Sequence, residues 1–374
     1  MINLLKYFSI SKEKVLSVYQ GFTAPQLTPN RYDALSEEGY QKNVFAFRAI
    51  NLISRGIASI PISIRDRENK KDDEKLTEIF KRPNEMQTKS SFLENVVSNL
   101  LISGNAFIHC NDADELHCLR ADRIQIIPNK SRTAVDSYTY CVDSSKFSIE
   151  KKDILHLKFF NPLNDWYGFS PLQAALHAID QFNEMSKHNI SILQNGGRPS
   201  GCLIVKNAEN LTNEQRRQLR SDIREAYQGT ANSGRVMVLE GGLEWKEMGL
   251  SPKDMDFNNG KNIAAREIAQ AFGVPPMLLG IVGDSSFASY KEARLHFWED
   301  TVLPIVELIR IEFESWLSSR FKRYVEMVFD LEAVHALISQ RESLWNKISN
   351  ADFLTVNEQR EILGYPPIKN GEKI

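Results

Sequence analysis

The chain is short of cysteine, of long apolar runs and of excess charge of either sign. Its 374 residues include only four cysteines at irregular spacing, which indicates a reducing compartment and no disulfide framework. No apolar run is long enough to span a bilayer and no signal peptide is recognisable, so we expect a soluble intracellular product without a membrane partner. A formal net charge of -2 argues against a basic DNA-coating protein, although DNA could still pass by without being gripped.

The motifs that usually carry enzyme chemistry are also missing. The nearest approach to a phosphate-binding loop is residues 259–262, and it fails because Met255 and Asn262 stand where the motif needs Gly and Ser or Thr. Residues 283–287 lack the second glycine of a nucleophile elbow. There is no H-E-x-x-H, no dinucleotide fingerprint and no repeat of fixed period. We therefore predict no catalytic residue, no cofactor and no metal.

Two weaker signals for chemistry are outweighed by structural interpretations. The doublets His109-Cys110 and His117-Cys118 could supply soft zinc ligands. Neighbouring residues of a strand point to opposite faces, however, so each doublet offers one side chain per face, and a half-buried hairpin is favoured. His156 could be a general base, but no nucleophile stands near it in the sequence, and we interpret it as structural.

Residue patterns in the first half predict an α+β fold. Residues 1–40 show weak signals and are interpreted as a loosely ordered arm or as plain terminal disorder. Helical spacing follows over 44–60, and a helix from Ser91 to Leu101 starts with the spacing of a capping box. The expected strands are 62–67, 104–110, 116–119, 138–142 and 154–159.

The second half is dominated by long helices. One helix should run from a cap at Ser170 to Asn195, and another should begin at Ser251-Pro252 and end at Gly273. Between them stands a strand–helix–strand–strand insert whose helix runs from a capping box at Thr212 to Tyr227. The remaining predictions are a helix over 290–321 kinked at Pro304, a strand over 325–329, a helix over 331–349, and a final helix from Thr355 to Gly364.

Several ordered motifs resemble the portal proteins of tailed bacteriophages, of the large family found in siphovirus and prophage heads. The run from Ile268 to Gly280 resembles the signature I-A-x-x-F-G-V-P-P-x-L-L-G. The other matches are Gly104–Phe107 for a G-N-A-Y strand, Asp153–His156 for D-I-L-H, Gly168–Leu172 for G-x-S-P-L, Arg198–Leu203 for R-P-S-G-x-L and Thr355–Pro367 for the ending T-x-N-E-x-R-x-x-x-G-x-P-P. The resemblance covers the chain from about residue 40 to its end.

The resemblance implies a portal fold with named parts. Residues 1–40 would be an N-terminal arm, 41–165 the first part of a mixed α/β wing, and 289–330 its long kinked helix and strand. The stem would consist of two helices, 166–197 and 250–273, with a small α/β clip, 198–249, inserted between them. Residues 274–288 would hold the tunnel loop, and 331–374 a short helical crown.

The family also implies a function, a location and partners. The chain is expected to form a homo-oligomeric ring, usually dodecameric, at the unique vertex of the virion capsid after assembly in the bacterial host cytoplasm. Double-stranded DNA would pass through its channel without sequence specificity during packaging and ejection. The expected protein partners are the large terminase, the head–tail adaptor, and the major capsid and scaffold proteins.

Two groups of residues are then candidates for functional contacts. The tunnel loop would present Gly283, Asp284, Ser285, Ser286 and Phe287 to the channel. It contains no cation, which suits sliding DNA because each cationic contact adds salt-sensitive affinity. In the clip, Arg216, Arg217, Arg220 and Arg224 could meet an acidic partner surface, although an ordinary solvated helix is an equally good interpretation.

Two other classes of protein remain as alternatives. A nucleic-acid-processing enzyme would need a metal-dependent carboxylate site, and no plausible set of carboxylates is found. The third hypothesis is a host-encoded scaffold for a different ring.

Overall fold

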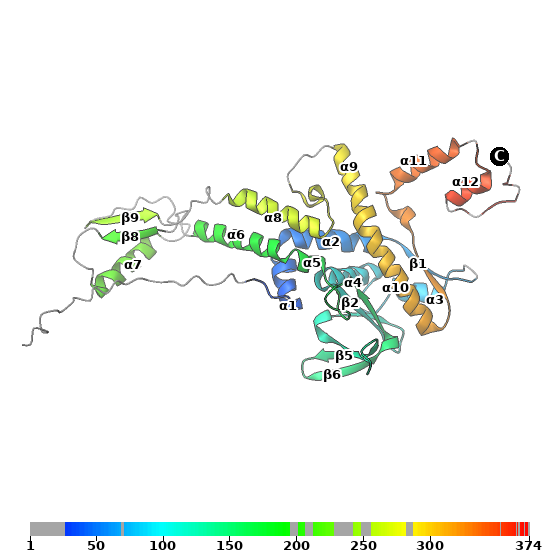
Figure 1. Ribbon diagram of the computed structural model, residues 1–374, viewed down its shortest axis with the longest axis horizontal. Coiled ribbons are helices and arrows are strands. Elements are labelled where there is room, and N and C mark those ends of the chain that lie inside the picture. The colour runs from blue at the N-terminus through cyan, green and yellow to red at the C-terminus, as the bar shows by residue number, and fades with distance from the viewer. Residues whose placement is uncertain are drawn as a thin grey trace, which may run out of the picture.

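The molecule is elongated, with a large body at one end of a helix pair and a small unit at the other (Figure 1). The computed structural model describes residues 27–68, 71–194, 201–205, 212–227, 242–247, 256–281, 287–351, 353–363, 365, 367–369 and 371–372. The helix pair consists of α6 (Leu176–Gln194) and α8 (Phe257–Ala271). The small unit holds α7 (Asn213–Tyr227) and the paired strands β8 (Gly201–Val205) and β9 (Leu243–Glu247).

The body is built around two helices, α2 (Val44–Ser59) and α4 (Lys89–Ser103), which pack against each other. Asn43 starts α2, because its side-chain oxygen accepts the backbone N–H groups of Phe45 and Ala46. Most of the apolar face predicted from helical spacing is buried, namely Ala49, Ile50, Ile53 and Ile57, together with Ala46. The predicted Val44 and Phe47 are instead 59% and 43% exposed. Two further helices, α3 (Glu74–Lys81) and α10 (Leu303–Phe321), cover this core, and Phe80 of α3 meets Phe313 of α10 edge to face.

Antiparallel strands of the body form three small sheets. In the described residues β1 (Ile62–Asp66) pairs with β10 (Val325–Phe329), and β2 (Asn105–Cys110) lies between β3 (Leu116–Leu119) and β7 (Ile154–Lys158). The third sheet orders β4 (Ile124–Pro128), β5 (Val135–Val142) and β6 (Ser145–Glu150). Every strand predicted for this body is confirmed, whereas β4 and β6 were not predicted. Short 3-10 helices η3 (Ala121–Arg123) and η4 (Lys151–Asp153) link the sheets.

The prediction of a loosely ordered arm up to residue 40 is wrong at its C-terminal end. Residues Tyr32–Ala34 form α1, and Leu35–Gln41 continue it as the π-helix η2. Leu35 is buried in the main core, and Gly39 lies so close to Leu172 that a side chain there would clash. Tertiary burial rather than local periodicity stabilises this segment, which explains why the sequence signal was weak.

Two predicted helix starts need different corrections. The helix expected from Ser91 begins at Lys89, because Thr88 is the residue whose hydroxyl accepts the N–H of Ser91. The capping box at Ser170 is confirmed, but the rod that it starts is divided at Ala175 into α5 (Pro171–Ala174) and α6. Backbone hydrogen bonds continue across the division, so the two pieces remain in line. The cap predicted at Ser251 lies outside the described residues, and α8 begins at Phe257.

The long helix predicted for 290–321 is divided by a π-helix. α9 (Phe287–His296) leads into the π-helical turn η7 (Phe297–Val302), and α10 follows. Pro304 stands in the first turn of α10, where its missing N–H widens the preceding turn. The irregularity therefore lies directly before the predicted kink.

The C-terminal residues form two short helices away from the body (Figure 1). A 3-10 turn η8 (Leu331–Ala333) precedes α11 (Ile338–Ser349), so the helix predicted over 331–349 starts later than expected. The capping box of Thr355 and Glu358 that opens α12 (Val356–Ile362) is confirmed. Gly364, the predicted helix end, lies outside the described residues.

Candidate functional site

Three sequence motifs that are far apart in the chain meet at Asn105, where the body joins α5. The side-chain oxygen of Asn105 accepts the N–H of Gly168 at 2.8 Å, and its amide nitrogen donates to the carbonyl oxygen of Ser103 at 2.8 Å. Ser170 accepts the N–H of Gln173 as a helix cap and donates its hydroxyl to the carbonyl of Ile102 at 2.9 Å. These buried bonds fix the direction in which the chain leaves the body.

His156 is the third member of this junction, and its chemistry is that of a neutral structural side chain. Its ring stacks on Phe107 with centroids 4.2 Å apart, and its Nε2 lies 3.0 Å from Asn105 Oδ1. Because that oxygen only accepts, Nε2 carries the hydrogen. Burial, with a smaller contribution from Lys158, lowers the pKa of His156 to about 3. These contacts support the structural interpretation of His156.

Glycine is required at the closest point of this junction. A Cβ atom on Gly168 would stand 2.1 Å from the carbonyl oxygen of Gly104 and 2.8 Å from that of Phe159. Gly104 ends α4 in the left-handed conformation, with φ of 77°, and accepts the N–H of Phe159. The glycines of two sequence motifs are therefore in direct backbone contact.

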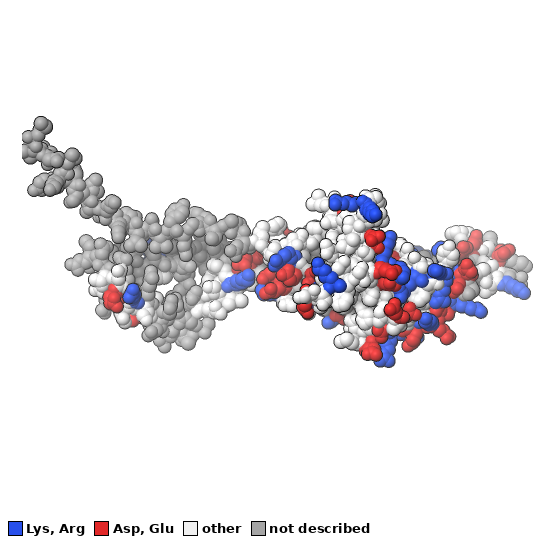
Figure 2. Space-filling model, turned by 90° about the horizontal axis from the view of Figure 1, so that it is seen from below, with Lys and Arg blue, Asp and Glu red and all other residues white. Residues whose placement is uncertain are grey.

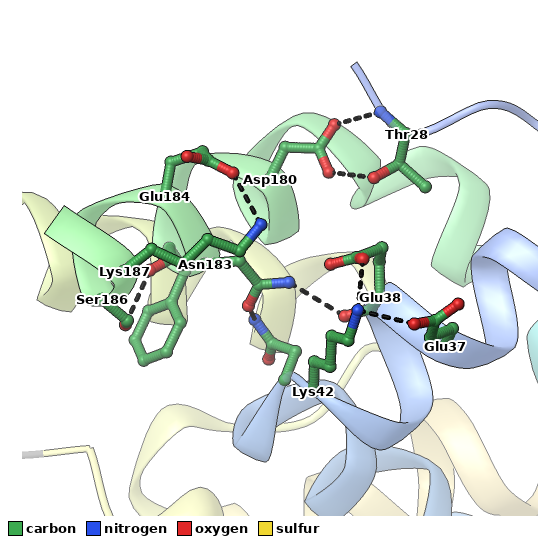
Figure 3. A network of polar contacts seen from close by, with 11 residues as sticks. Thr28, Glu37, Glu38, Lys42, Asp180, Asn183, Glu184, Ser186 and Lys187 are labelled. Atoms are coloured by element: carbon green, nitrogen blue, oxygen red, sulfur yellow. Dashed lines mark hydrogen bonds and ion pairs between the residues drawn. The ribbon is translucent and has the colours of Figure 1, made fainter. Parts of the chain in front are cut away.

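A polar network anchors α6 to the N-terminal part of the body (Figure 3). Thr28 donates its backbone N–H and its hydroxyl to the two carboxylate oxygens of Asp180, at 2.9 and 2.5 Å. Asn183 donates to the carbonyl oxygen of Glu38 at 3.0 Å and accepts from the buried amide of Asn43. Lys42 pairs with both Glu37 and Glu38. The same Asn43 thus starts α2 and holds α6.

The I-A-x-x-F-G-V-P-P-x-L-L-G segment turns the chain from α8 towards the predicted tunnel loop. Its apolar residues are buried in the main core: Ile268, Ala269, Phe272, Val274 and Leu279. Gly273 follows α8 with φ of 65°, and its carbonyl accepts the hydroxyl of Thr301 at 2.6 Å. The two prolines then lead into the 3-10 helix η6 (Pro276–Leu279). The motif thereby anchors the loop on its N-terminal side.

Four of the five predicted tunnel-loop residues, Gly283, Asp284, Ser285 and Ser286, lie outside the described residues. Phe287 is the first residue of α9, but its side chain is also outside the description. The loop is bounded by buried Ile281 on one side and by α9 on the other. Exposed Lys291 and Arg294 stand on the first turns of α9, so cations flank the loop. The sequence analysis did not weigh these two residues.

The predicted docking arginines belong to α7, as expected. Thr212 and Gln215 form the predicted capping box, with hydrogen bonds of 2.9 and 3.3 Å. Arg217 is exposed, while the side chains of Arg216, Arg220 and Arg224 are outside the description. Strands β8 and β9 pair from Gly201 opposite Glu247 to Val205 opposite Leu243. The strand predicted over 234–239 lies outside the described residues.

The His-Cys doublets face each other across β2 and β3, where His109 is the register partner of His117. Burial raises the pKa of the Cys110 thiol to about 11 and that of Cys118 to about 12, so both remain protonated and are poor metal ligands. In the described part of the chain, no group of three or more His, Cys, Asp or Glu side chains is arranged to hold a metal ion.

Acidic and basic side chains are interspersed over the face of the body shown in Figure 2, and neither sign forms a continuous patch there. Such a surface has no strong single-sign field to hold a nucleic acid. None of the described helices combines the length and apolar character needed to cross a bilayer.

Sequence reasoning missed the junction at Asn105 because its partners are distant in the chain: His156 lies 51 residues and Gly168 lies 63 residues after Asn105. The signal that could have found it was the pair of glycines, because each lies within two residues of a polar side chain that makes buried hydrogen bonds: Asn105 follows Gly104, and Ser170 lies two residues after Gly168. The residue types alone do not indicate that the backbones of these two glycines are in contact, because that contact depends on the tertiary structure.

Comparison with known proteins gives a consistent assignment. The family model described as phage portal protein matches residues 45–364. A chain in the neck of an empty gene transfer agent (GTA) particle, computed with C6 symmetry, is 38% identical with a TM-score of 0.71, over 94% of this chain and 98% of that one. A chain in the virion of a native GTA particle is 37% identical with a TM-score of 0.70, over 93% and 97%.

A curated relative extends the similarity to a bacteriophage. The portal protein of Enterobacteria phage HK97 is 24% identical over 344 residues, which cover 87% of this chain and 79% of that protein. This family is structural rather than enzymatic, and it does not favour the alternative of a metal-dependent nucleic-acid enzyme. On the match of the family model across most of its length, the chain belongs to the phage portal protein family.

Proposed function

We propose that this protein is the portal subunit of a phage-like particle, forming a ring at one capsid vertex through which DNA enters and leaves. The observation that carries the proposal is the shared fold and 38% identity, over nearly the whole chain, with a protein in the neck of a GTA particle. That particle neck was computed with six-fold symmetry. A cyclic arrangement of identical subunits leaves an axial opening, which is the property that a DNA channel needs.

In this proposal, different parts of the elongated subunit have different roles in the ring. The body corresponds to the wing, α5 and α6 with α8 to the stem, and α7 with β8 and β9 to the clip. The helices α11 and α12 correspond to the crown. The division is supported by the separation of the two ends of the molecule by the α6–α8 pair (Figure 1).

The tunnel loop, residues 283–287, is proposed to line the channel. Asp284 repels phosphate, and the hydroxyls of Ser285 and Ser286 make weak contacts that exchange quickly, so DNA slides rather than binds. Lys291 and Arg294 on α9 would sit behind the loop and attract DNA towards the opening from a short distance. The chain is buried at Leu279 and Ile281, directly before this segment.

The exposed helix α7 is proposed to be the docking surface for the large terminase and then for the head–tail adaptor. Arg216, Arg220 and Arg224 recur every fourth residue, so they form one row along the helix. A row of guanidinium groups binds an acidic surface and speeds association. Replacing Arg216 and Arg220 by Glu should weaken terminase binding at least tenfold at low salt, as measured by surface plasmon resonance, without changing ring assembly.

The whole proposal is tested by native mass spectrometry and negative-stain imaging of the purified full chain. The expected result is a closed ring with a central opening and no turnover of ATP or cleavage of DNA with Mg²⁺. A protein that stays monomeric at all concentrations, together with Mg²⁺-dependent cleavage, would overturn it.

The channel role of the loop has its own test. Asp284→Lys combined with Ser285→Arg should leave the ring intact, and it should raise the affinity of the ring for double-stranded DNA with a steeper salt dependence. Ser285→Ala is the matched neutral control. If the charged variant binds DNA no more tightly than the control, the loop does not face the channel.

A further inference from the structure

The segment between β7 and α5, residues 159–169, is a loop whose own side chains fix its shape. Asn161 accepts the N–H of Leu163 at 3.0 Å and donates to the carbonyl of Tyr167 at 2.9 Å. Asn164 accepts the N–H groups of Trp166 and Tyr167 at 2.9 and 3.0 Å. At its C-terminal end the loop is held by the junction of Gly168 with Asn105. It therefore has one preferred conformation before any partner arrives.

This rigid loop presents two large apolar side chains to solvent. Phe160 is 86% exposed and Leu163 is 95% exposed. Both belong to the described body, where most large apolar residues are packed into the core. A pair of exposed apolar side chains on a preformed loop is typical of a contact surface, because little conformational entropy is lost when it is covered.

Next to this pair stands an exposed carboxylate. Asp165 is exposed, and its carboxylate forms no ion pair within the described residues. The backbone carbonyl of Asp165 accepts the ammonium group of Lys158, which helps to hold the loop. The surface therefore combines two apolar groups with one unpaired negative charge.

A surface of matching composition lies at the start of α2. Val44, Phe47 and Arg48 are all exposed, and their spacing of three and four residues places them on one face of the helix. Arg48 forms no ion pair with any residue that the structure describes. This surface therefore has two apolar groups and one unpaired positive charge, so its charge is opposite to that of the loop.

We propose that the loop of one subunit, through Phe160, Leu163 and Asp165, docks on Val44, Phe47 and Arg48 of the adjacent copy in the ring. The inference rests on the proposed function, since it needs neighbouring copies. A cyclic ring of more than two subunits joins two different faces of the same chain, so each subunit must carry both a loop and its receiving surface. Apolar burial supplies the affinity, and the pair Asp165–Arg48 fixes the register.

Removal of the apolar pair tests the contact. In the full-length chain, Phe160→Ser with Leu163→Ser should raise the concentration at which half of the subunits are in rings by about tenfold or more, as measured by mass photometry. The control is Met86→Ser, since Met86 is 95% exposed elsewhere on the body. Circular dichroism should give the same thermal midpoint for all three proteins. Unchanged assembly of the double variant would overturn the inference.

A charge exchange tests the partner surface. Asp165→Arg and Arg48→Asp should each weaken assembly, and their combination should restore it, because the exchanged pair attracts again. If the double variant assembles as poorly as the two single effects added together predict, Arg48 is not the partner of Asp165. A wild-type chain that forms no ring at any concentration would instead refute the proposed portal function, so the two failures are distinguishable.

Discussion

The body and the α6–α8 extension use the same kinds of residue for opposite purposes. In the body, apolar side chains and motif glycines are buried, and polar groups such as Asn105 and Ser170 make their full set of hydrogen bonds internally. In the extension, the last turns of α6 leave Ile190 exposed and Leu193 65% exposed, and α8 leaves Ile263 exposed. The body has a well-packed core with exposed apolar groups only on its surface, whereas the described part of the extension leaves a larger share of its apolar side chains exposed.

Because of this difference, mutations in the two regions should affect different properties, namely the stability of the chain and the assembly of the ring. Changes to buried residues of the body should lower the free energy of unfolding of the isolated chain. Changes in the extension should leave that free energy almost unaltered and act on assembly. The predictions below test this contrast, in order of decreasing effect on stability.

The largest effect is expected for Gly168→Ala. The new Cβ would meet two backbone carbonyl oxygens, which cannot move aside without displacing α4 or β7. We expect a loss of about 3 kcal/mol or more in the free energy of unfolding, measured by urea denaturation. Gly280→Ala is the comparison variant: Gly280 has a positive φ of 76°, unlike Gly168, but no atom lies within 4 Å of its added Cβ, so this variant contains backbone strain without a close contact. Equal losses in the two variants would show that the close approach is unimportant.

The second effect is a dependence of stability on pH. The pKa of His156 is lowered to about 3 in the folded chain, below its ordinary value of about 6.5. Protons therefore bind the unfolded chain first, and the stabilisation is complete above pH 6.5 and is lost as the pH falls towards 3. The loss should be up to about 1.4 kcal/mol per pH unit.

The variant His156→Gln isolates this contribution, because glutamine can still donate to Asn105 but does not titrate. Unfolding curves between pH 7 and 4 should be less steeply pH-dependent for the variant than for the wild type. His109, whose pKa is also lowered by burial, remains in both proteins and cancels in the comparison. Identical pH dependence would contradict a neutral, structural His156.

A smaller effect is expected at the boundary between body and extension. Asp180→Ala removes both hydrogen bonds to Thr28 and should cost about 1–2 kcal/mol. It should also speed tryptic cleavage after Arg31, because Thr28 no longer anchors the segment. Glu184→Ala removes only the exposed pair with Lys187 and serves as the control. Cleavage at equal rates in both variants would mean that this anchor does not hold α6 to the body.

The smallest effect on stability is expected within the extension itself. Ile190→Ser with Leu193→Ser should change the free energy of unfolding by less than about 0.5 kcal/mol, because both side chains are already exposed. The same variant should form rings less readily, as measured by mass photometry. A marked loss of monomer stability would show that the extension is packed within a single chain after all.

Local signals in the sequence were sufficient to predict most helices and strands of the body. Helical periodicity located α2, alternation located β1, and the capping boxes at Ser170, Thr212 and Thr355 located three helix starts, because these depend on neighbouring residues alone. Predictions failed where the stabilising contacts are distant. The helix over residues 32–41 depends on burial of Leu35 against other elements, and β4 and β6 depend on pairing with β5.

The sequence by itself determined the family and most of the helices and strands, since the motifs are contiguous runs whose residue types can be read directly. Only the tertiary structure decided what those motifs do: Gly104, Gly168, Asn105 and His156 meet in one junction, and Asn43 both starts α2 and holds α6. The physical reason is that backbone clearance and buried hydrogen bonds are properties of pairs of segments. No single segment contains the information about which other segment it will touch.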